Sequence, residues 1–127
     1  IGLRKELSVF GDDYQTPDGT CIRDYIHIID LAQAHMLAMN APKSGHYNLG
    51  TGHGLSVKEI ISSARRVTGH PIPAEVAPRR AGDPPRLIAC SDLAKQELGW
   101  KPRFEDADTI IESVWKWVQK YPEGYKS

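Results

Sequence analysis

The sequence predicts a mixed α/β fold, in which helices pack on a small mixed sheet. Two observations predict it: stretches with a helical apolar period alternate with strand-like stretches, and the strand-like stretches are few and short. The 127 residues are enough for one modest core. We therefore expect one domain over residues 1–127, which is too short for a full doubly wound sheet.

Two strand candidates precede the first helix. Residues 8–10 form the first, and the turn residues that crowd positions 11–20 end it. Residues 23–28 alternate toward a second strand, with Tyr25 and His27 on one face. We interpret His27 as a packed, hydrogen-bonded histidine rather than a catalyst.

The first helix is expected over residues 31–39. Asp30 stands where a carboxylate can accept hydrogen bonds from the first free amides, and Gln33 follows at the capping-box position. The stretch 40–42 ends the helix, because its proline cannot continue it. Residues 46–49 are the next strand candidate.

A second helix follows the glycine-rich loop at residues 50–54. Ser56 and Glu59 form a full capping box at its start, and Gly69 stands where a left-handed residue closes a helix. Between them lies an apolar stripe at helical spacing, which comprises Val57, Ile60, Ile61, Ala64 and Val67.

The second half of the chain adds a short strand, a loop and two helices. Residues 75–77 form the strand, and residues 78–86 form an irregular loop because two consecutive prolines prevent regular pairing. A short helix capped by Ser91 or Asp92 reaches Leu98. The last helix runs from Asp106 to Lys120, and its expected inward residues are Ile110, Ile111, Val114, Trp115 and Val118.

Composition argues against several classes of partner. Sixteen basic and sixteen acidic residues cancel, whereas nucleic-acid-binding domains usually carry net positive charge. No apolar run approaches the roughly 20 residues that span a bilayer. Cys21 and Cys90 stand far apart in no metal-like spacing, as is typical of reduced thiols in the cytoplasm. We expect a cytoplasmic protein that binds neither nucleic acid, membrane nor metal.

Three motifs are candidates for anion binding. The turn at residues 50–54 lacks the spacing of a dinucleotide or P-loop site, so we interpret it as a structural turn that leads to the Ser56 cap. The loop at residues 79–86 holds three arginines and an aspartate, and a guanidinium matches a phosphate bidentately. A solvated surface loop is an equally valid interpretation. Arg23 and Tyr25 leave a similar choice, between a phosphate grip and an Arg–Asp pair beside a half-buried tyrosine.

No catalytic set is visible in the sequence. It shows no Ser/His/Asp or Cys/His arrangement with persuasive spacing, no zinc pattern and no Tyr-x-x-x-Lys pair. The residues by themselves therefore indicate an anion-binding α/β chain without a catalytic group.

Four stretches carry a resemblance to a known family: residues 9–20 with 22–27, 47–52, 77–83, and 91–94 with 97–100. In order and spacing they resemble the UDP-glucose 4-epimerases of the extended short-chain dehydrogenase/reductase superfamily. The Gly-Asp-Asp-Tyr to Asp-Gly-Thr stretch is specific to these epimerases, whereas Arg-Asp-Tyr-Ile-His and Tyr-Asn-Leu-Gly are shared more widely among nucleotide-sugar enzymes. The resemblance covers almost the whole chain and implies the C-terminal, UDP-sugar-binding part of such an enzyme.

The resemblance implies a role for seven residues. Arg23 and Arg80 would hold the diphosphate, and Asp83 would contact the nucleotide ribose. Ser8 and Phe10 would belong to the strand that lines the uracil pocket. Tyr25 would lie beside the site and Leu87 near the sugar. At the leucine's position a smaller residue is associated with acceptance of N-acetylhexosamines, so acceptance of these sugars stays open.

The resemblance also implies NAD as cofactor, bound by an N-terminal Rossmann domain whose glycine-rich loop, tyrosine and lysine are not in this sequence. Such enzymes interconvert UDP-galactose and UDP-glucose by oxidising and re-reducing sugar carbon 4. We therefore expect no catalytic residue in this chain, no epimerase activity of the chain alone, a homodimeric parent enzyme and a monomeric chain. Two alternatives stay open: a related epimerase or decarboxylase acting on UDP-glucuronate, and a stand-alone nucleotide-sugar-binding module.

Overall fold

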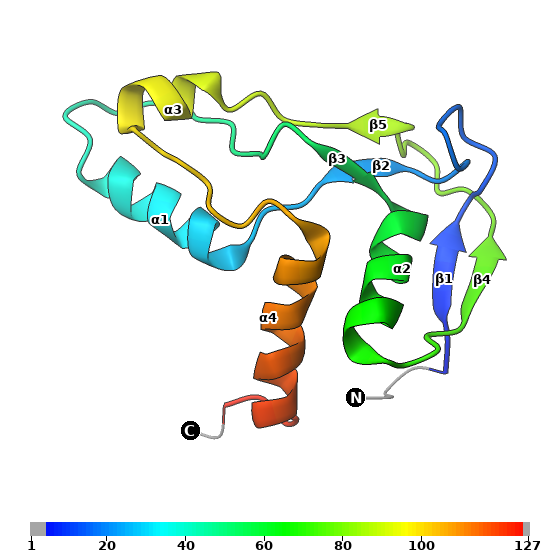
Figure 1. Cartoon of the computed structure of the whole chain (residues 1–127). Helices are drawn as coiled ribbons and strands as arrows, with labels where there is room; N and C mark the ends of the chain where they lie inside the picture. Colours follow the sequence, from blue (N-terminus) through cyan, green and yellow to red (C-terminus); the bar gives the residue numbers. More distant parts are fainter. Residues whose placement is uncertain (1–4, 126–127) are drawn as a thin grey trace.

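The structure is a computed structural model that describes residues 5–125. Helices and short strands alternate along the chain, as the sequence predicts (Figure 1). In chain order they are β1 (Leu7–Phe10), β2 (Ile22–Asp24), α1 (Ile28–Met39), β3 (Gly54–Ser56), α2 (Val57–Thr68), β4 (Ala74–Ala77), β5 (Arg86–Leu87), α3 (Asp92–Leu98) and α4 (Ala107–Lys120). The α/β class is therefore confirmed.

The strands form two small sheets rather than one. β1 pairs in parallel with β4, from Leu7 opposite Ala74 to Phe10 opposite Ala77. β2 is the centre of the second sheet, antiparallel to β3 and parallel to β5. The second sheet is thus mixed, and the segment between β1 and β2 joins the two sheets (Figure 1).

The expected strand at residues 23–28 is half right. It ends at Asp24, and α1 begins at Ile28 with His27 as its N-cap. The His27 ring is 3% exposed: its Nδ1 accepts from the Ile29 amide at 3.1 Å, and its Nε2 lies 2.9 Å from the Ser113 hydroxyl. The packed, hydrogen-bonded role expected for His27 is confirmed, and capping explains why the strand stops early.

Asp30 is not the cap of α1. It lies in the first turn with its side chain fully buried, where the carboxylate accepts from the amides of Arg103 and Phe104, each at 2.9 Å. Gln33 therefore completes no capping box. Trp100, also fully buried, donates to the Asp30 carbonyl oxygen at 2.9 Å and packs with Ala34 and Ala94 in the core. The aspartate joins α1 to the segment before α4.

Residues 46–49, expected as a strand, form none. Tyr47 and Leu49 instead pack against the core around Trp100. The following backbone is held by a side chain, because the Asp24 carboxylate accepts from the amide of Thr51 at 2.9 Å and that of Gly52 at 3.1 Å. The Asp24 carboxylate thus satisfies backbone amides that a neighbouring strand would otherwise bond.

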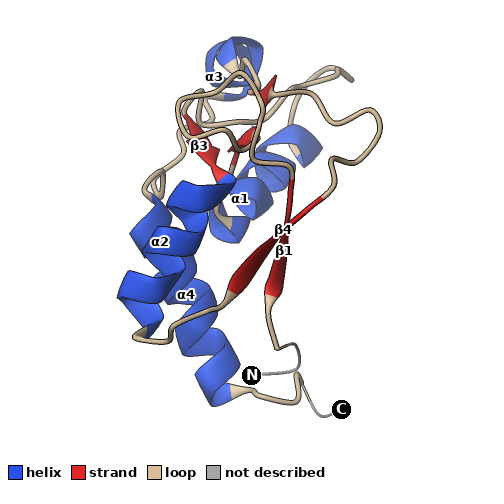
Figure 2. Ribbon diagram, turned by 90° about the vertical axis from the view of Figure 1, so that its right-hand side faces the viewer, coloured by secondary structure: helices blue, strands red, loops and turns tan. Residues whose placement is uncertain are grey.

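The second and fourth helices lie side by side (Figure 2). The capping box of α2 is present as expected, with Glu59 donating its amide to the Ser56 hydroxyl at 3.0 Å, and Gly69 ends the helix at φ +70°. Asp108 of α4 accepts from Ser63 and pairs with Arg66 of α2. The expected inward stripe of α4 is only partly right, because none of residues 107–120 is fully buried and Val114 is 54% exposed.

The helix α3 spans the expected residues, but its expected cap is absent. Ser91 makes no capping bond and instead donates its hydroxyl to the Gly50 carbonyl oxygen at 2.8 Å. Between residues 5 and 125, no helix is long and apolar enough to cross a membrane. Both Cys21 and Cys90 carry free thiols.

Candidate functional site

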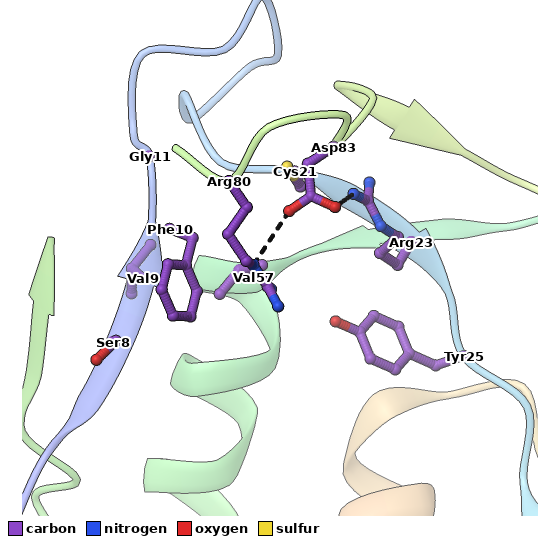
Figure 3. Close-up of a pocket in the computed structure, with 10 residues that line it drawn as sticks. All are labelled: Ser8, Val9, Phe10, Gly11, Cys21, Arg23, Tyr25, Val57, Arg80 and Asp83. Atoms are coloured by element: carbon purple, nitrogen blue, oxygen red, sulfur yellow. Dashed lines mark hydrogen bonds and ion pairs between the residues drawn. The ribbon is translucent and has the colours of Figure 1, made fainter. Parts of the chain in front are cut away.

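A pocket of about 230 Å³ opens where the end of β1, strand β2, the first turn of α2 and the loop after β4 meet (Figure 3). Six of the seven residues singled out in the sequence line it, and they come from segments up to 75 positions apart. The lining residues are Ser8, Val9, Phe10, Gly11, Cys21, Arg23, Tyr25, Val57, Arg80 and Asp83. The structure therefore brings two separate arginine motifs to one place.

The two arginines of the pocket share one carboxylate. Asp83 lies 3.4 Å from the Arg23 Nη2 atom and 3.3 Å from the Arg80 Nε atom (Figure 3). Of the two interpretations left open for Arg23, the structure shows an Arg–Asp pair, but with the distant Asp83, since the neighbouring Asp24 accepts from loop amides. One negative charge between two positive ones leaves the cluster with a net positive charge, which suits an anionic ligand.

The guanidinium groups of Arg23 and Arg80 differ in exposure and in how many of their donors are engaged. Arg23 is 23% exposed and donates to the carbonyl oxygens of Ile22 and Pro84, both at 2.9 Å. Arg80 is 65% exposed, and its guanidinium carbon lies 4.2 Å from the centre of the Phe10 ring. Arg23 is therefore fixed by the backbone, whereas Arg80 keeps most of its donors free for a ligand.

Strand β1 supplies one wall. Ser8 and Phe10 project from alternate positions, as expected for one face of a strand, while Val9 is 5% exposed. Tyr25 lies across the pocket, just after β2, and its partial burial raises its pKa above the ordinary value of 10.0. A neutral phenol therefore faces the pocket near pH 7 and can both donate and accept a hydrogen bond.

A tight turn holds the first turn of α2 beside the pocket. The Asp18 carboxylate accepts from Thr20 and from the Ser56 hydroxyl, and Lys58 donates to the Asp18 carbonyl oxygen at 2.9 Å. Partial burial acts to raise the pKa of Asp18, but these hydrogen bonds outweigh it and hold the pKa below its ordinary value of 3.8. The Asp-Gly-Thr stretch thus has a structural role here.

The glycine-rich turn at residues 50–54 is structural, as interpreted from the sequence. Its amides at Thr51 and Gly52 are taken by Asp24, so they are not free to hold a phosphate. A side chain at Gly50 would place its Cβ 2.5 Å from the Asp24 carboxylate, which explains the glycine. Within residues 5–125, no cluster of His, Cys, Asp or Glu could hold a metal ion.

One of the seven residues lies outside the pocket. Leu87 is on β5, in register with Arg23 of β2, and its side chain is 60% exposed. Sequence reasoning in turn missed several lining residues, of which Cys21 and Val57 gave no signal, since an isolated cysteine and the first residue of an apolar stripe look like ordinary core positions. Gly11, with φ +88°, could have been found from its place at a strand end.

Comparison with known proteins identifies the family of the chain. Residues 2–113 match the model of the family described as GDP-mannose 4,6 dehydratase. The chain is 53% identical to UDP-glucose 4-epimerase of Halalkalibacterium halodurans over all of its own length and 39% of the relative's, and 59% identical to that of Corynebacterium glutamicum over 90% and 36%. The chain thus spans about two-fifths of the length of the curated relatives it matches.

Solved structures of relatives have the same fold as the chain. The crystal structure of UDP-glucose 4-epimerase from Bifidobacterium longum in complex with NAD+ and UDP is 45% identical to the chain, covers 98% of it with 38% of its own length, and superposes with a TM-score of 0.89. A UDP-Glc/GlcNAc 4-epimerase from Campylobacter jejuni is 43% identical, with a TM-score of 0.81 over 94% of this chain and 37% of its own. The chain therefore belongs to the GDP-mannose 4,6-dehydratase family and matches the C-terminal part of its UDP-glucose 4-epimerases.

Proposed function

We propose that residues 1–127 form the UDP-sugar-binding domain of a UDP-glucose 4-epimerase, the enzyme that interconverts UDP-galactose and UDP-glucose by NAD-dependent oxidation and re-reduction at sugar carbon 4. One observation carries the proposal: Arg23 and Arg80 converge on one pocket with Asp83 between them. Two guanidinium groups match the two charged phosphates of a nucleoside diphosphate.

The remaining walls suit a nucleotide. Phe10 and Ser8 of β1 offer an apolar face and a hydroxyl for the uracil, and Asp83 is close enough to the arginines to accept from the ribose hydroxyls of the same nucleotide. Tyr25 adds a neutral phenol at the edge. Leu87, exposed beside Arg23, is assigned to the sugar end.

Firm binding of the diphosphate has a chemical purpose in this reaction. The hexose must turn between the oxidation and the reduction so that hydride returns to its other face. Charge-assisted hydrogen bonds from Arg23 and Arg80 would retain the UDP group while the sugar turns. This chain therefore contributes binding rather than a reacting group.

The residues of this chain do not fit NAD. The glycine-rich turn at residues 50–54 has its amides engaged by Asp24, and the dinucleotide fingerprint is not in the sequence. We assign the cofactor and the catalytic groups to residues outside this sequence. The chain alone is then inactive and monomeric, the parent enzyme is a cytoplasmic homodimer, and conversion of UDP-galactose by the purified chain with NAD would contradict the assignment.

Substitution of Arg80 tests the proposed function. Arg80→Ala removes a charged hydrogen-bond donor and is expected to weaken UDP binding by about 2–3 kcal/mol, a loss of roughly 30- to 150-fold in affinity. Isothermal titration calorimetry of the chain with UDP measures it.

Arg86→Ala is the matched control, because Arg86 is an exposed arginine of β5 that does not line the pocket. It should bind UDP as the unsubstituted chain does. An unchanged UDP affinity of a folded Arg80→Ala variant would show that Arg80 does not bind the diphosphate, and would contradict the proposal that two arginines hold it.

A further inference from the structure

Arg79 is the immediate neighbour of a pocket arginine but does not line the pocket. Its Nε donates to the Asp13 carboxylate at 2.5 Å, and its Nη2 donates to the Asp13 carbonyl oxygen. Its guanidinium carbon lies 4.1 Å from the centre of the Tyr14 ring. The donors and the flat face of this arginine are thus engaged by two consecutive residues of another segment, which we call the Arg79 clamp (Arg79, Asp13 and Tyr14).

The receiving side of the clamp is well anchored. The Tyr14 side chain is 6% exposed, and its amide donates to the Gly19 carbonyl oxygen at 2.9 Å. The Gly11 amide donates to the Ala77 carbonyl oxygen at 2.9 Å, which ties the end of β1 to the end of β4. The flat face of the guanidinium therefore meets a ring that is already fixed, so little further order is needed to hold the stacked arrangement.

Gly11 makes room for the clamp. A Cβ at this position would stand 2.6 Å from the Arg79 Cγ and 2.7 Å from the Tyr14 Cε2, and the residue has φ +88°. The stem of Arg79 therefore passes directly over the glycine. The close approach needs a residue without a side chain, so the turn after β1 and the arginine fit each other.

The loop that carries the pocket groups has few other restraints at this end. Arg80 is 65% exposed and is held by Asp83 of the same loop and by the Phe10 ring. At the far end, Arg23 donates to the Pro84 carbonyl oxygen. Arg79 supplies the restraint at the near end, one residue before the group that would meet the ligand.

We propose that Arg79 is a positioning residue, which sets the place of Arg80 and Asp83 for the diphosphate without touching the ligand. The inference rests on the proposed function, since it concerns the same pocket. The contrasting possibility is that Arg79 binds the anion directly, as a second donor of the Arg79–Arg80 pair. The two possibilities predict opposite effects of one substitution on UDP affinity.

Asp13→Asn separates them. If Arg79 met the anion directly, removal of a nearby carboxylate would leave a more positive site and UDP would bind as tightly as before or more tightly. If the clamp positions the loop, the same change releases Arg79 and UDP binding weakens, by about threefold to fivefold for a partly exposed ion pair. The side chain of Asp13 is 74% exposed, so the variant is expected to fold.

Arg79→Lys is the second variant. It keeps the positive charge but loses the fork that reaches both the carboxylate and the carbonyl oxygen of Asp13, so it should weaken UDP binding as Asp13→Asn does. The double variant should bind UDP no more weakly than the weaker-binding single variant, since both changes remove the same contact between Arg79 and Asp13. Glu112→Gln, which removes one exposed carboxylate from α4, is the control for charge and should change nothing.

The experiment is UDP titration calorimetry on these variants, together with the NMR resonance of the Arg80 Nε–H, because the Nε atom lies 3.3 Å from the Asp83 carboxylate and the guanidinium carbon lies 4.2 Å from the centre of the Phe10 ring. The proposal expects weaker binding in Asp13→Asn and Arg79→Lys, and a shift of the resonance toward that of a free arginine. Unchanged or tighter UDP binding by Asp13→Asn overturns it. Failure of the proposed function looks different: UDP then binds neither the unsubstituted chain nor its variants, and the Arg80 resonance alone decides whether Arg79 positions Arg80.

Discussion

Two glycines show how single positions differ in what they tolerate. Gly19 has φ +81°, and a Cβ there would stand 1.9 Å from the Asp12 carbonyl oxygen. Gly52 has nearly the same φ, +80°, but a Cβ would meet nothing within 4 Å. The pair therefore separates the cost of backbone conformation from the cost of a clash, within one chain.

Gly19→Ala is expected to destabilise the chain much more than Gly52→Ala. The second change should cost about 1 kcal/mol for the left-handed conformation alone, whereas the first adds a collision with backbone and should cost at least about 3 kcal/mol. Urea unfolding followed by circular dichroism measures both. Equal costs would mean that the turn at residues 11–20 can move aside.

At the scale of elements, the first turn of α2 is tied to the Asp-Gly-Thr turn through Asp18 and Ser56. The pKa of Asp18 is lowered from 3.8 in the folded chain, so its ionised form is stabilised by folding. Its contribution to stability is therefore fully present above pH 3.8 and is lost as the pH falls through the lower, folded value.

Asp18→Asn should thus be destabilising near neutral pH but less so in acid. The difference in unfolding free energy between the two proteins is expected to shrink as the pH falls below 3.8. Urea titrations across that range test it. Asp106 and Asp108 also have lowered pKa values, so the comparison must be this difference and not the stability of one protein. A difference independent of pH would contradict the role given to the Asp18 charge.

The elements also show what local sequence can predict. Of the four helices between residues 5 and 125, three were expected with ends within one residue, because proline, glycine and capping signals act through near neighbours. The start of α1 was wrong because His27 caps the helix while Asp30 bonds to an amide 73 positions away, and the strand at residues 46–49 was wrong because Tyr47 and Leu49 pack against the core around Trp100. Local patterns contain no signal for such distant partners.

The candidate site could also be predicted only in part from the sequence. Arg23, Arg80 and Asp83 could be named because their motifs resemble a family, and the structure brings them into one pocket. The chemistry of the residues alone left phosphate binding and a solvated loop undecided. Without the resemblance, the chemistry of the residues could not separate Arg79 from Arg80, since only the position of the turn at Asp13 and Tyr14 decides which of the two faces the pocket.

The whole molecule has a small interior for its length. The buried apolar cluster around Trp100 is compact, and α4 has no fully buried residue. Several large apolar side chains of α1 and α4 are exposed, among them Ile28, Met36, Met39 and Trp117. A chain with so little buried apolar surface is expected to be modestly stable, so a bound ligand should add visibly to its stability.

UDP should therefore raise the thermal midpoint of the chain. At a concentration of about 100 times its dissociation constant, a ligand that binds only the folded state adds about 2.7 kcal/mol. Differential scanning calorimetry should show a rise of several degrees with UDP and a smaller one with uridine, which lacks the diphosphate. An equal effect of the two would locate the binding energy in the base and not in the arginines.

The carboxylates of Asp24, which is partly buried, and Asp30, which is fully buried, have one more consequence for the molecule as a whole. Each gathers the amides of a segment that belongs to no sheet, so residues 51–52 and 103–104 are fixed without a strand partner. These two side chains determine the spacing of segments that in most α/β proteins is set by backbone ladders. Insertions in these loops would break that spacing, so their lengths are constrained as closely as the lengths of strands.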